Sequence, residues 1–209
     1  MAFAFSAQRQ GAWSTDAADA MTAEILSRDT VYKGYLRVQR LILRLDGGAE
    51  VMREIEDHGD SVAVLPYDPR SRMALIVSLL RAPALDKTGQ VALEEACAGM
   101  IDEGDAEDTV RREALEEIGV RLGELEFVAR VWPSPGGMAE RASLFLAPYG
   151  PADRIAAGGG LAAEHENITV IERSLADLAA AADAGAIDDL KLLTLVQTLR
   201  LRRPELFTA

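Results

Sequence analysis

The sequence has one cysteine, no long apolar segment and no excess of positive charge. Cys97 has no second cysteine with which to pair, which excludes a fold held together by internal disulfides. The longest apolar run, residues 73–80, contains Ser78 and is much shorter than the roughly 20 residues that cross a bilayer. The first residues, MAFAFSAQ, contain neither a basic segment nor the full apolar segment of a secretory signal. We therefore expect a cytoplasmic protein that does not bind membranes.

Basic residues are outnumbered in this chain. There are 22 Lys and Arg residues against 34 Asp and Glu residues, which gives a formal net charge of −12. Such a field repels polyanions, so we expect no binding to nucleic acid. It also repels an anionic substrate, so a phosphate-handling site in this chain needs local arginines and bound cations. With 209 residues, the chain can form one sizeable core and a small appended subdomain.

Residues 99–120, GMIDEGDAEDTVRREALEEIGV, form the most informative segment. Its pattern predicts a helix over residues 106–118. Asp105 suits the position that caps the start of this helix, and Gly119 suits the position just after its end. The segment therefore places a helix directly behind the turn that begins at Gly99.

Three acidic residues of this helix, Glu113, Glu116 and Glu117, stand at positions i, i+3 and i+4, so they share one face. Like charges this close repel one another unless solvent or a cation screens them. Carboxylate oxygens suit Mg²⁺ or Mn²⁺ better than softer metals. The alternative is a solvated helix face with intrahelical pairs such as Arg112 with Glu116.

The segment resembles the Nudix box, which reads Gly, five residues, Glu, seven residues, then Arg-Glu-U-x-Glu-Glu-x-Gly-U, where U is aliphatic. Residues 112–120 match the second half of the box at the right spacing. Upstream, Asp105 takes the first Glu position and only six residues separate it from Arg112. A box shortened in this way resembles that of Nudix enzymes of the GDP-mannose pyrophosphatase branch.

The resemblance implies a metal site and a nearby base. A divalent cation, Mg²⁺ or Mn²⁺, is expected on the carboxylates of Glu113, Glu116 and Glu117 and on the backbone carbonyl of Ala98. Residues 158–168, GGGLAAEHENI, resemble the acidic loop that closes over the substrate in ADP-ribose and GDP-mannose pyrophosphatases. Glu164 and Glu166 are both candidates for the catalytic base, and Glu116 is a third. The glycines predict a loop that is mobile or distant from the helix in the free protein, and the alternative is an exposed acidic loop without a catalytic role.

Three further residues are expected to contact the substrate. The segment Ser134-Pro135-Gly136-Gly137 followed by Glu140 resembles a block that borders the diphosphate and sugar pocket in the same families, which makes Glu140 a substrate contact. Arg81 resembles a phosphate contact, and Arg53 stands where related enzymes place base or ribose contacts. Taken alone, the first block is only a turn between strands, and Arg81 is equally suited to a surface salt bridge. His58 and His165 have no spacing that indicates zinc.

The apolar pattern predicts an α/β fold, and the resemblance specifies a Nudix α/β/α sandwich with an N-terminal strand-rich subdomain. Residues 1–45 are expected to be the extension, which serves dimerisation in similar enzymes, and residues 46–209 the Nudix domain. We expect Tyr35, Val38, Leu41 and Leu43 of the extension to pack on a second subunit of a homodimer. Residues 82–89 are expected to be a loop. Strands are expected at residues 30–45, 50–56, 61–66, 73–80, 91–100, 125–132, 142–149 and 168–172, and further helices at 174–185 and 188–202.

The resemblance therefore implies an enzyme that hydrolyses the diphosphate bond of a nucleoside diphosphate sugar. ADP-ribose and GDP-mannose are the leading substrates, and the products are a nucleoside monophosphate and a sugar phosphate. Two alternatives remain. One is a hydrolase of the same fold that removes unwanted nucleoside triphosphates, and the other is a sugar-nucleotide sensor that binds without turnover.

Overall fold

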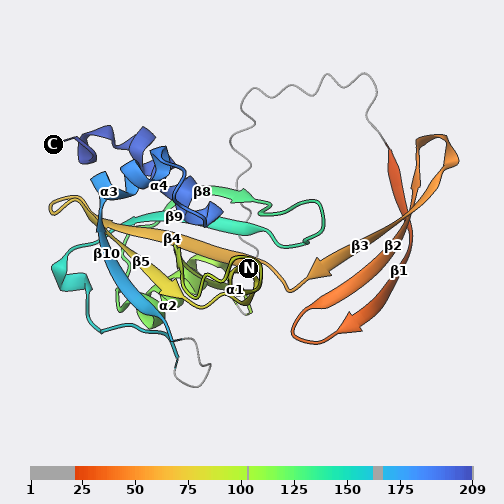
Figure 1. Cartoon of the computed structure of the whole chain (residues 1–209), viewed down its shortest axis with the longest axis horizontal. Helices are drawn as coiled ribbons and strands as arrows, with labels where there is room; N and C mark the ends of the chain where they lie inside the picture. The colour runs from red at the N-terminus through yellow and green to blue at the C-terminus, as the bar shows by residue number, and fades with distance from the viewer. Residues whose placement is uncertain (1–21, 103, 162–166, 209) are drawn as a thin grey trace, which may run out of the picture.

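A seven-stranded mixed sheet forms the main body of the computed structural model, which describes residues 22–102, 104–161 and 167–208 (Figure 1). The strands are β4 (Ser61–Asp68), β5 (Met73–Leu79), β6 (Leu93–Glu95), β7 (Cys97–Met100), β8 (Glu126–Val131), β9 (Ala142–Pro148) and β10 (Thr169–Ser174). Their order is β10-β5-β4-β9-β8, with β6 paired to β5 and β7 paired to β4. The strands β4 and β9 run parallel. Because β4 lies at the centre of the sheet, it is buried along its whole length.

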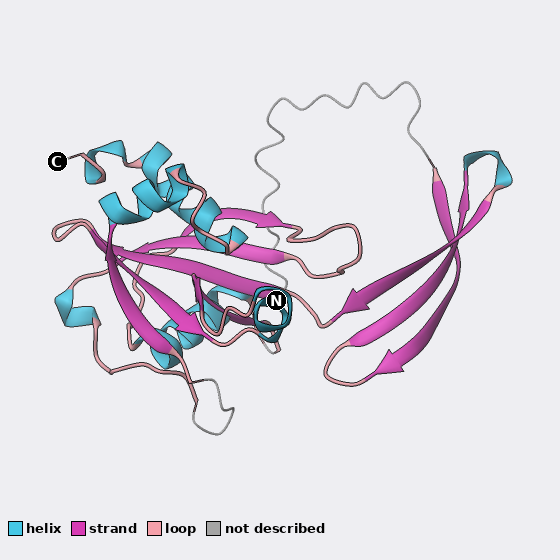
Figure 2. Cartoon of the chain, viewed as in Figure 1, coloured by secondary structure: helices cyan, strands magenta, loops and turns pink. Residues whose placement is uncertain are grey.

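Helices cover both faces of this sheet (Figure 2). They are α2 (Ala106–Ile118) on one face, and α3 (Leu175–Asp183) and α4 (Leu190–Arg202) on the other. Alternate residues of a strand point to opposite faces. Val64 of β4 accordingly packs in the apolar cluster of Val110 in α2, whereas Leu65 packs in the cluster of Leu195 in α4. The predicted α/β/α sandwich is confirmed. Among the described residues, no helix is long and apolar enough to cross a membrane.

The helix α2 begins and ends where its sequence predicts. The Oδ1 atom of Asp105 accepts hydrogen bonds from the backbone N–H groups of Glu107 and Asp108, both at 2.9 Å. Gly119 ends the helix with a φ of 71°, in the left-handed region that favours glycine. Asp105 therefore has a structural role as the N-cap in this shortened box.

Two expectations between β5 and α2 are wrong. Residues 82–89 form a short helix, α1 (Ala82–Thr88), instead of a loop, with a proline in its first turn and Gly89 at its C-terminal end. Residues 91–100 form two strands instead of one. The chain pairs first with β5 through β6 and then with β4 through β7, so the segment breaks at Ala96 where it changes partner.

A separate three-stranded sheet precedes the main body. Its strands are β1 (Ala23–Lys33), β2 (Arg37–Leu45) and β3 (Glu50–Asp57), in the order β1-β2-β3. The hairpin expected between β2 and β3 is confirmed. The single strand expected at residues 30–45 is wrong, because the chain turns at residues 34–36. Gly34 in this turn lies against the ring of Tyr32, which would have to move to admit a Cβ atom.

The small sheet stands to one side of the main body (Figure 1). It includes β3, so it contains residues on both sides of the boundary expected at residue 45. None of the described helices packs extensively against it. The pairing places Leu41 and Leu43 on one face together with Ile25, whereas Val38 lies on the opposite face. The expectation that Val38 shares a face with Leu41 and Leu43 is therefore wrong.

Candidate active site

Glu113 lies directly over the backbone of Gly99. A Cβ atom on Gly99 would overlap the carboxyl group of Glu113. The Glu113 side chain is only 12% exposed. A larger residue than glycine at the start of the box would therefore displace the Glu113 side chain from its present position.

Glu117 is buried beside the same backbone segment. Its Oε2 atom accepts a hydrogen bond of 3.0 Å from the backbone N–H of Ala98, and the residue is 5% exposed. The neighbouring Cys97 is fully buried. Burial, and then the charges of Glu117 and Glu113, raise the pKa of the Cys97 thiol well above its ordinary value, so it stays protonated. Cys97 is therefore a buried, protonated thiol of the core.

Arg112 bridges two of the box carboxylates. Its Nη2 atom lies 2.7 Å from Oε1 of Glu113, and its Nη1 atom donates to Oε2 of Glu116 at 3.0 Å. In the ranges that the structure describes, no three His, Cys, Asp or Glu side chains converge closely enough to form a ready metal site. The donor set nevertheless fits Mg²⁺ or Mn²⁺, because Glu113 and Glu117 are fixed against the Ala98–Gly99 backbone and offer hard oxygen ligands.

The glycine run 158–160 is attached to the C-terminal end of α2. The N–H of Gly159 donates to the carbonyl of Glu117 at 2.8 Å, and the N–H of Gly160 donates to the carbonyl of Glu116 at 3.1 Å. A Cβ atom on Gly158 would overlap this part of the helix backbone. The expectation that this loop is mobile or distant from the helix is wrong for its glycine run, where glycine is needed for close approach. Glu164 and Glu166 themselves lie outside the described residues.

Arg81 forms a two-pronged ion pair with a buried carboxylate. Its Nε and Nη2 atoms donate to the two oxygens of Glu95 at 2.6 and 3.0 Å. The Glu95 side chain is 4% exposed, whereas that of Arg81 is 46% exposed. The hydrogen bond to Glu95 raises the pKa of Arg81 above its ordinary value. Arg81 is thus a fixed, half-exposed cation at the end of β5, with the chemistry of a phosphate ligand.

This ion pair continues into a buried network that the sequence did not reveal. The Nζ atom of Lys191 lies 3.4 Å from Glu95 and 2.7 Å from Asp189. Asp189 also accepts from the backbone N–H of Ala96 at 3.1 Å and caps α4. Burial alone would lower the pKa of Lys191. The charges and hydrogen bonds of Asp189 and Glu95 outweigh this effect and raise the pKa above its ordinary value, so the ammonium is charged. The network ties the start of α4 to the segment between β6 and β7.

We predict that Asp189→Ala destabilises the protein by about 3 kcal/mol. The variant removes an N-cap and leaves the mostly buried Lys191 with one acidic partner instead of two. The free energy of unfolding from urea denaturation measures the effect. Asp188→Ala is the matched control, because Asp188 is the exposed preceding residue and its removal should change stability by less than about 0.5 kcal/mol. Equal stabilities of the two variants would contradict the role of the network.

The remaining expected contacts lie in two different places. Glu140 follows the Ser134–Gly137 turn at the edge of the main body, and its side chain is 12% exposed. Arg53 lies in β3, where its Nη1 atom donates to the carbonyl of Met52 at 2.8 Å. The structure therefore places Glu113 and Glu116 against Arg112 and Glu117 against the backbone of Ala98, while Arg53 lies in strand β3 of the small sheet (Figure 1).

The fold and this site define an α/β/α protein whose acidic helix, packed on a glycine turn, can hold divalent cations. Residues 57–194 match the NUDIX domain model, so the chain belongs to the NUDIX family. It is 33% identical to a GDP-mannose pyrophosphatase of Cronobacter sakazakii over 87% of this chain and 97% of that protein. It is 36% identical to an ADP-ribose pyrophosphatase of Escherichia coli (strain K12) over 88% of this chain and 90% of that protein.

A solved structure agrees with the fold. The chain superimposes on a crystal structure titled ADP compounds hydrolase with a TM-score of 0.70. The alignment covers 88% of this chain and 95% of the other, at 15% sequence identity. At this identity the comparison supports the fold alone.

Proposed function

We propose that this protein hydrolyses the diphosphate bond of a nucleoside diphosphate sugar, with ADP-ribose and GDP-mannose as the leading substrates. Water adds to one phosphorus atom and the bridging P–O bond breaks, which gives a nucleoside monophosphate and a sugar phosphate. The observation that carries the proposal is the packing of Glu113 and Glu117 against the Ala98–Gly99 backbone. The names of the relatives at 33% and 36% identity support the substrate class. The proposed location is the cytoplasm.

The proposed roles combine the resemblance to Nudix enzymes with the contacts of the described side chains. Glu113, Glu116, Glu117 and the Ala98 carbonyl hold Mg²⁺ or Mn²⁺. The bound cation supplies charge neutralisation at the diphosphate and lowers the pKa of a bound water. Arg112 orients the carboxylates of Glu113 and Glu116 through its two ion pairs.

The substrate is held by groups outside the acidic helix. Arg81, whose guanidinium is held in place by its hydrogen bonds to Glu95, contacts the diphosphate. Glu140 accepts hydrogen bonds from sugar hydroxyls, and Arg53 contacts the base or ribose. Glu164 or Glu166 takes the proton from the attacking water. In a chain with a net charge of −12, these few arginines and the metal provide the local attraction that the whole protein does not.

A substrate panel tests this proposal against its alternatives. ADP-ribose, GDP-mannose, other nucleotide sugars and nucleoside triphosphates are incubated with Mg²⁺ or Mn²⁺, and the products are separated by ion-exchange chromatography. We expect a nucleoside monophosphate and a sugar phosphate in equal amounts from at least one nucleotide sugar. Pyrophosphate release from triphosphates alone would indicate the housecleaning hydrolase. Binding in a calorimeter without product would indicate the sensor.

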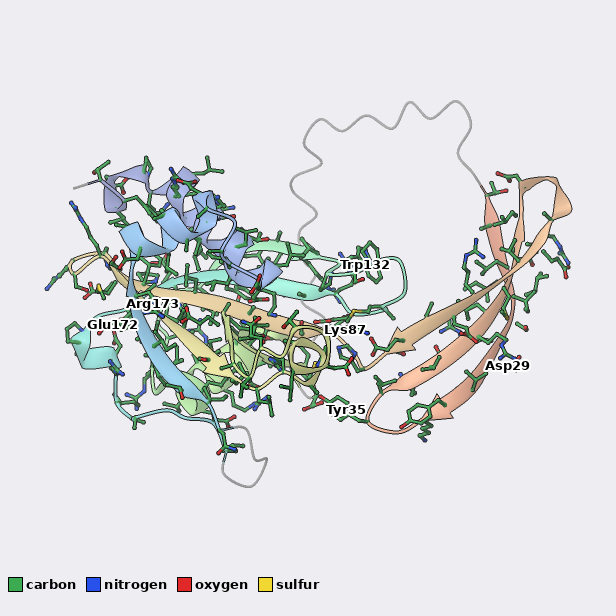
Figure 3. The ribbon with its side chains drawn as sticks, viewed as in Figure 1. Asp29, Tyr35, Lys87, Trp132, Glu172 and Arg173 are labelled. Atoms are coloured by element: carbon green, nitrogen blue, oxygen red, sulfur yellow. The ribbon has the colours of Figure 1, made fainter. Side chains whose placement is uncertain are left out.

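We also propose a homodimer formed through the small sheet. The sheet is a single layer of three strands, and none of the described helices packs extensively against it. Its residues Ile25 and Met52 are 52% and 53% exposed, and Tyr35 at the turn between β1 and β2 is 92% exposed (Figure 3). The face that carries Ile25, Leu41 and Leu43 is the more apolar one. Arg53 opposes Leu41 on that face, so a dimer formed through this face would bring Arg53 to the interface.

Sedimentation at micromolar concentration should therefore give a mass of about 45 kDa, twice the chain mass of 22.5 kDa. Ile25→Glu places a charge on the proposed interface and should give monomers. Met52→Glu is the matched control, because Met52 is equally exposed on the same sheet but pairs with Ile42 on the opposite face. A monomeric mass for the unaltered chain would refute the dimer.

A further inference from the structure

His58 lies at the junction between the small sheet and the main sheet, one residue after the end of β3. Its side chain is 19% exposed and stands between two carboxylates. The Nδ1 atom contacts Oε1 of Glu56, and the Nε2 atom lies 3.4 Å from Oε2 of Glu140. The imidazole thus connects a residue of the small sheet to the expected sugar contact.

The carboxylate of Glu140 is held from both of its oxygens. Oε1 accepts a hydrogen bond of 2.5 Å from the hydroxyl of Ser61 at the start of β4, and Oε2 faces His58. The oxygens of a side chain that is only 12% exposed need such hydrogen-bond partners. Ser61 belongs to the rigid central strand of the sheet. His58 is therefore the partner of Glu140 that comes from the junction.

The backbone joins the same two regions. The N–H of Glu56 donates to the carbonyl of Gly137 at 2.7 Å, and the N–H of Ala139 donates to the carbonyl of Glu56 at 2.8 Å. Residues 134–141 are therefore attached to the end of β3. The side-chain contacts of His58 lie beside this attachment and depend on the same segment being in place.

We propose that His58 is a positioning residue that fixes the carboxylate of Glu140 and fastens the 134–141 segment to the end of β3. The part that concerns substrate rests on the proposed function, in which Glu140 contacts the sugar. The contact between His58 and Glu140 does not rest on it, because both side chains are placed by the fold alone.

The charge of His58 decides how strong this contact is. Burial by itself lowers the pKa of His58, but the hydrogen bonds and charges of Glu56 and Glu140 outweigh it and raise the pKa above its ordinary value. The other acidic groups of the junction have their own partners. Asp57 pairs with Arg37 at 2.7 Å, and Asp60 contacts Arg130 and accepts from the backbone N–H of Arg141 at 2.9 Å.

A raised pKa fixes the direction of the pH effect. The imidazolium stabilises the junction fully below the ordinary histidine pKa of about 6.5, and this contribution is lost as the pH rises through the higher value of the folded state. The position of Glu140 should therefore loosen on the alkaline side.

Imidazole NMR tests the contact without any assay of activity. The sequence contains two histidines, so His165→Gln leaves one imidazole signal to titrate, that of His58. We expect its pKa to lie above about 6.5 and to fall in Glu140→Gln. Glu50→Gln at the other end of β3 is the matched control and should leave the pKa unchanged. A His58 pKa at or below the ordinary value, or one that does not respond to Glu140→Gln, would overturn the proposal.

Kinetics with a cleaved nucleotide sugar tests the positioning role. The amide nitrogen of Gln in His58→Gln can take the place of Nε2 and still donate to Glu140, whereas Asn in His58→Asn reaches only the Nδ1 position near Glu56. We expect KM to rise roughly tenfold in His58→Asn, with little change in kcat, and to be largely restored in His58→Gln. In both variants KM should lose its rise on the alkaline side.

The outcomes separate this proposal from the proposed function. If Glu140→Gln raises KM and both His58 variants leave it unchanged, the positioning role is wrong although Glu140 contacts the substrate. If no nucleotide sugar is cleaved, the proposed function fails, and the NMR titration still decides whether His58 and Glu140 interact.

Discussion

Glu117→Gln should reduce turnover by about 10² or more, which corresponds to roughly 3 kcal/mol of activation free energy. The substitution keeps the shape of the side chain and removes one negative charge from the proposed metal ligands. Its amide oxygen can still accept the hydrogen bond from the N–H of Ala98, so the contact between α2 and β7 should survive. The loss should therefore appear in kcat and in the Mg²⁺ concentration needed for half-maximal rate.

Stability distinguishes this chemical effect from unfolding. Removing a charge from a residue that is 5% exposed, close to Glu113, should leave the metal-free protein at least as stable in thermal unfolding. Glu107→Gln is the matched control, since Glu107 belongs to the same helix but its side chain is 57% exposed and lies 3.8 Å from Arg111. An unchanged turnover in Glu117→Gln would remove the metal face from the mechanism.

The ends of α2 could be predicted from the sequence because the interactions that fix them are local. Asp105 accepts from residues two and three positions along the chain, and Gly119 needs only its own left-handed φ. The shared face of Glu113, Glu116 and Glu117 follows from the helical repeat in the same way.

Other features depend on residues that are distant in sequence. The close contact at Gly99 comes from Glu113, and the fixed position of Arg81 comes from Glu95. The contact of His58 with Glu140 could not be predicted, because it depends on how β3 and the 134–141 segment meet. The sequence shows only that polar or charged residues, Glu56, His58 and Ser61, lie around the junction of two predicted strands.

The turn at residues 34–36 and the helix α1 were missed for a different reason. Residues 30–45 alternate well enough to suit one long strand, and only the pairing of Lys33 with Arg37 shows where the chain turns back. In α1, Pro83 occupies the first turn of the helix, where a missing N–H costs nothing, so the proline is compatible with a helix.

The second large effect is expected in the loop that carries Glu164 and Glu166. Replacing the true base by Gln should lower kcat on the order of 10² to 10⁴ while substrate affinity stays nearly the same, because the amide cannot accept the proton of the attacking water. The other variant should have a much smaller effect. Each variant thus serves as the control for the other, with affinity measured by calorimetry in Ca²⁺.

The described ends of this loop are attached to the C-terminal end of α2 and to each other. Gly159 and Gly160 donate to the carbonyls of Glu117 and Glu116, and the N–H of Ile168 donates back to the carbonyl of Gly159 at 3.3 Å. If both substitutions leave turnover unchanged, the loop has no catalytic part, and Glu116 or Glu140 must provide the base.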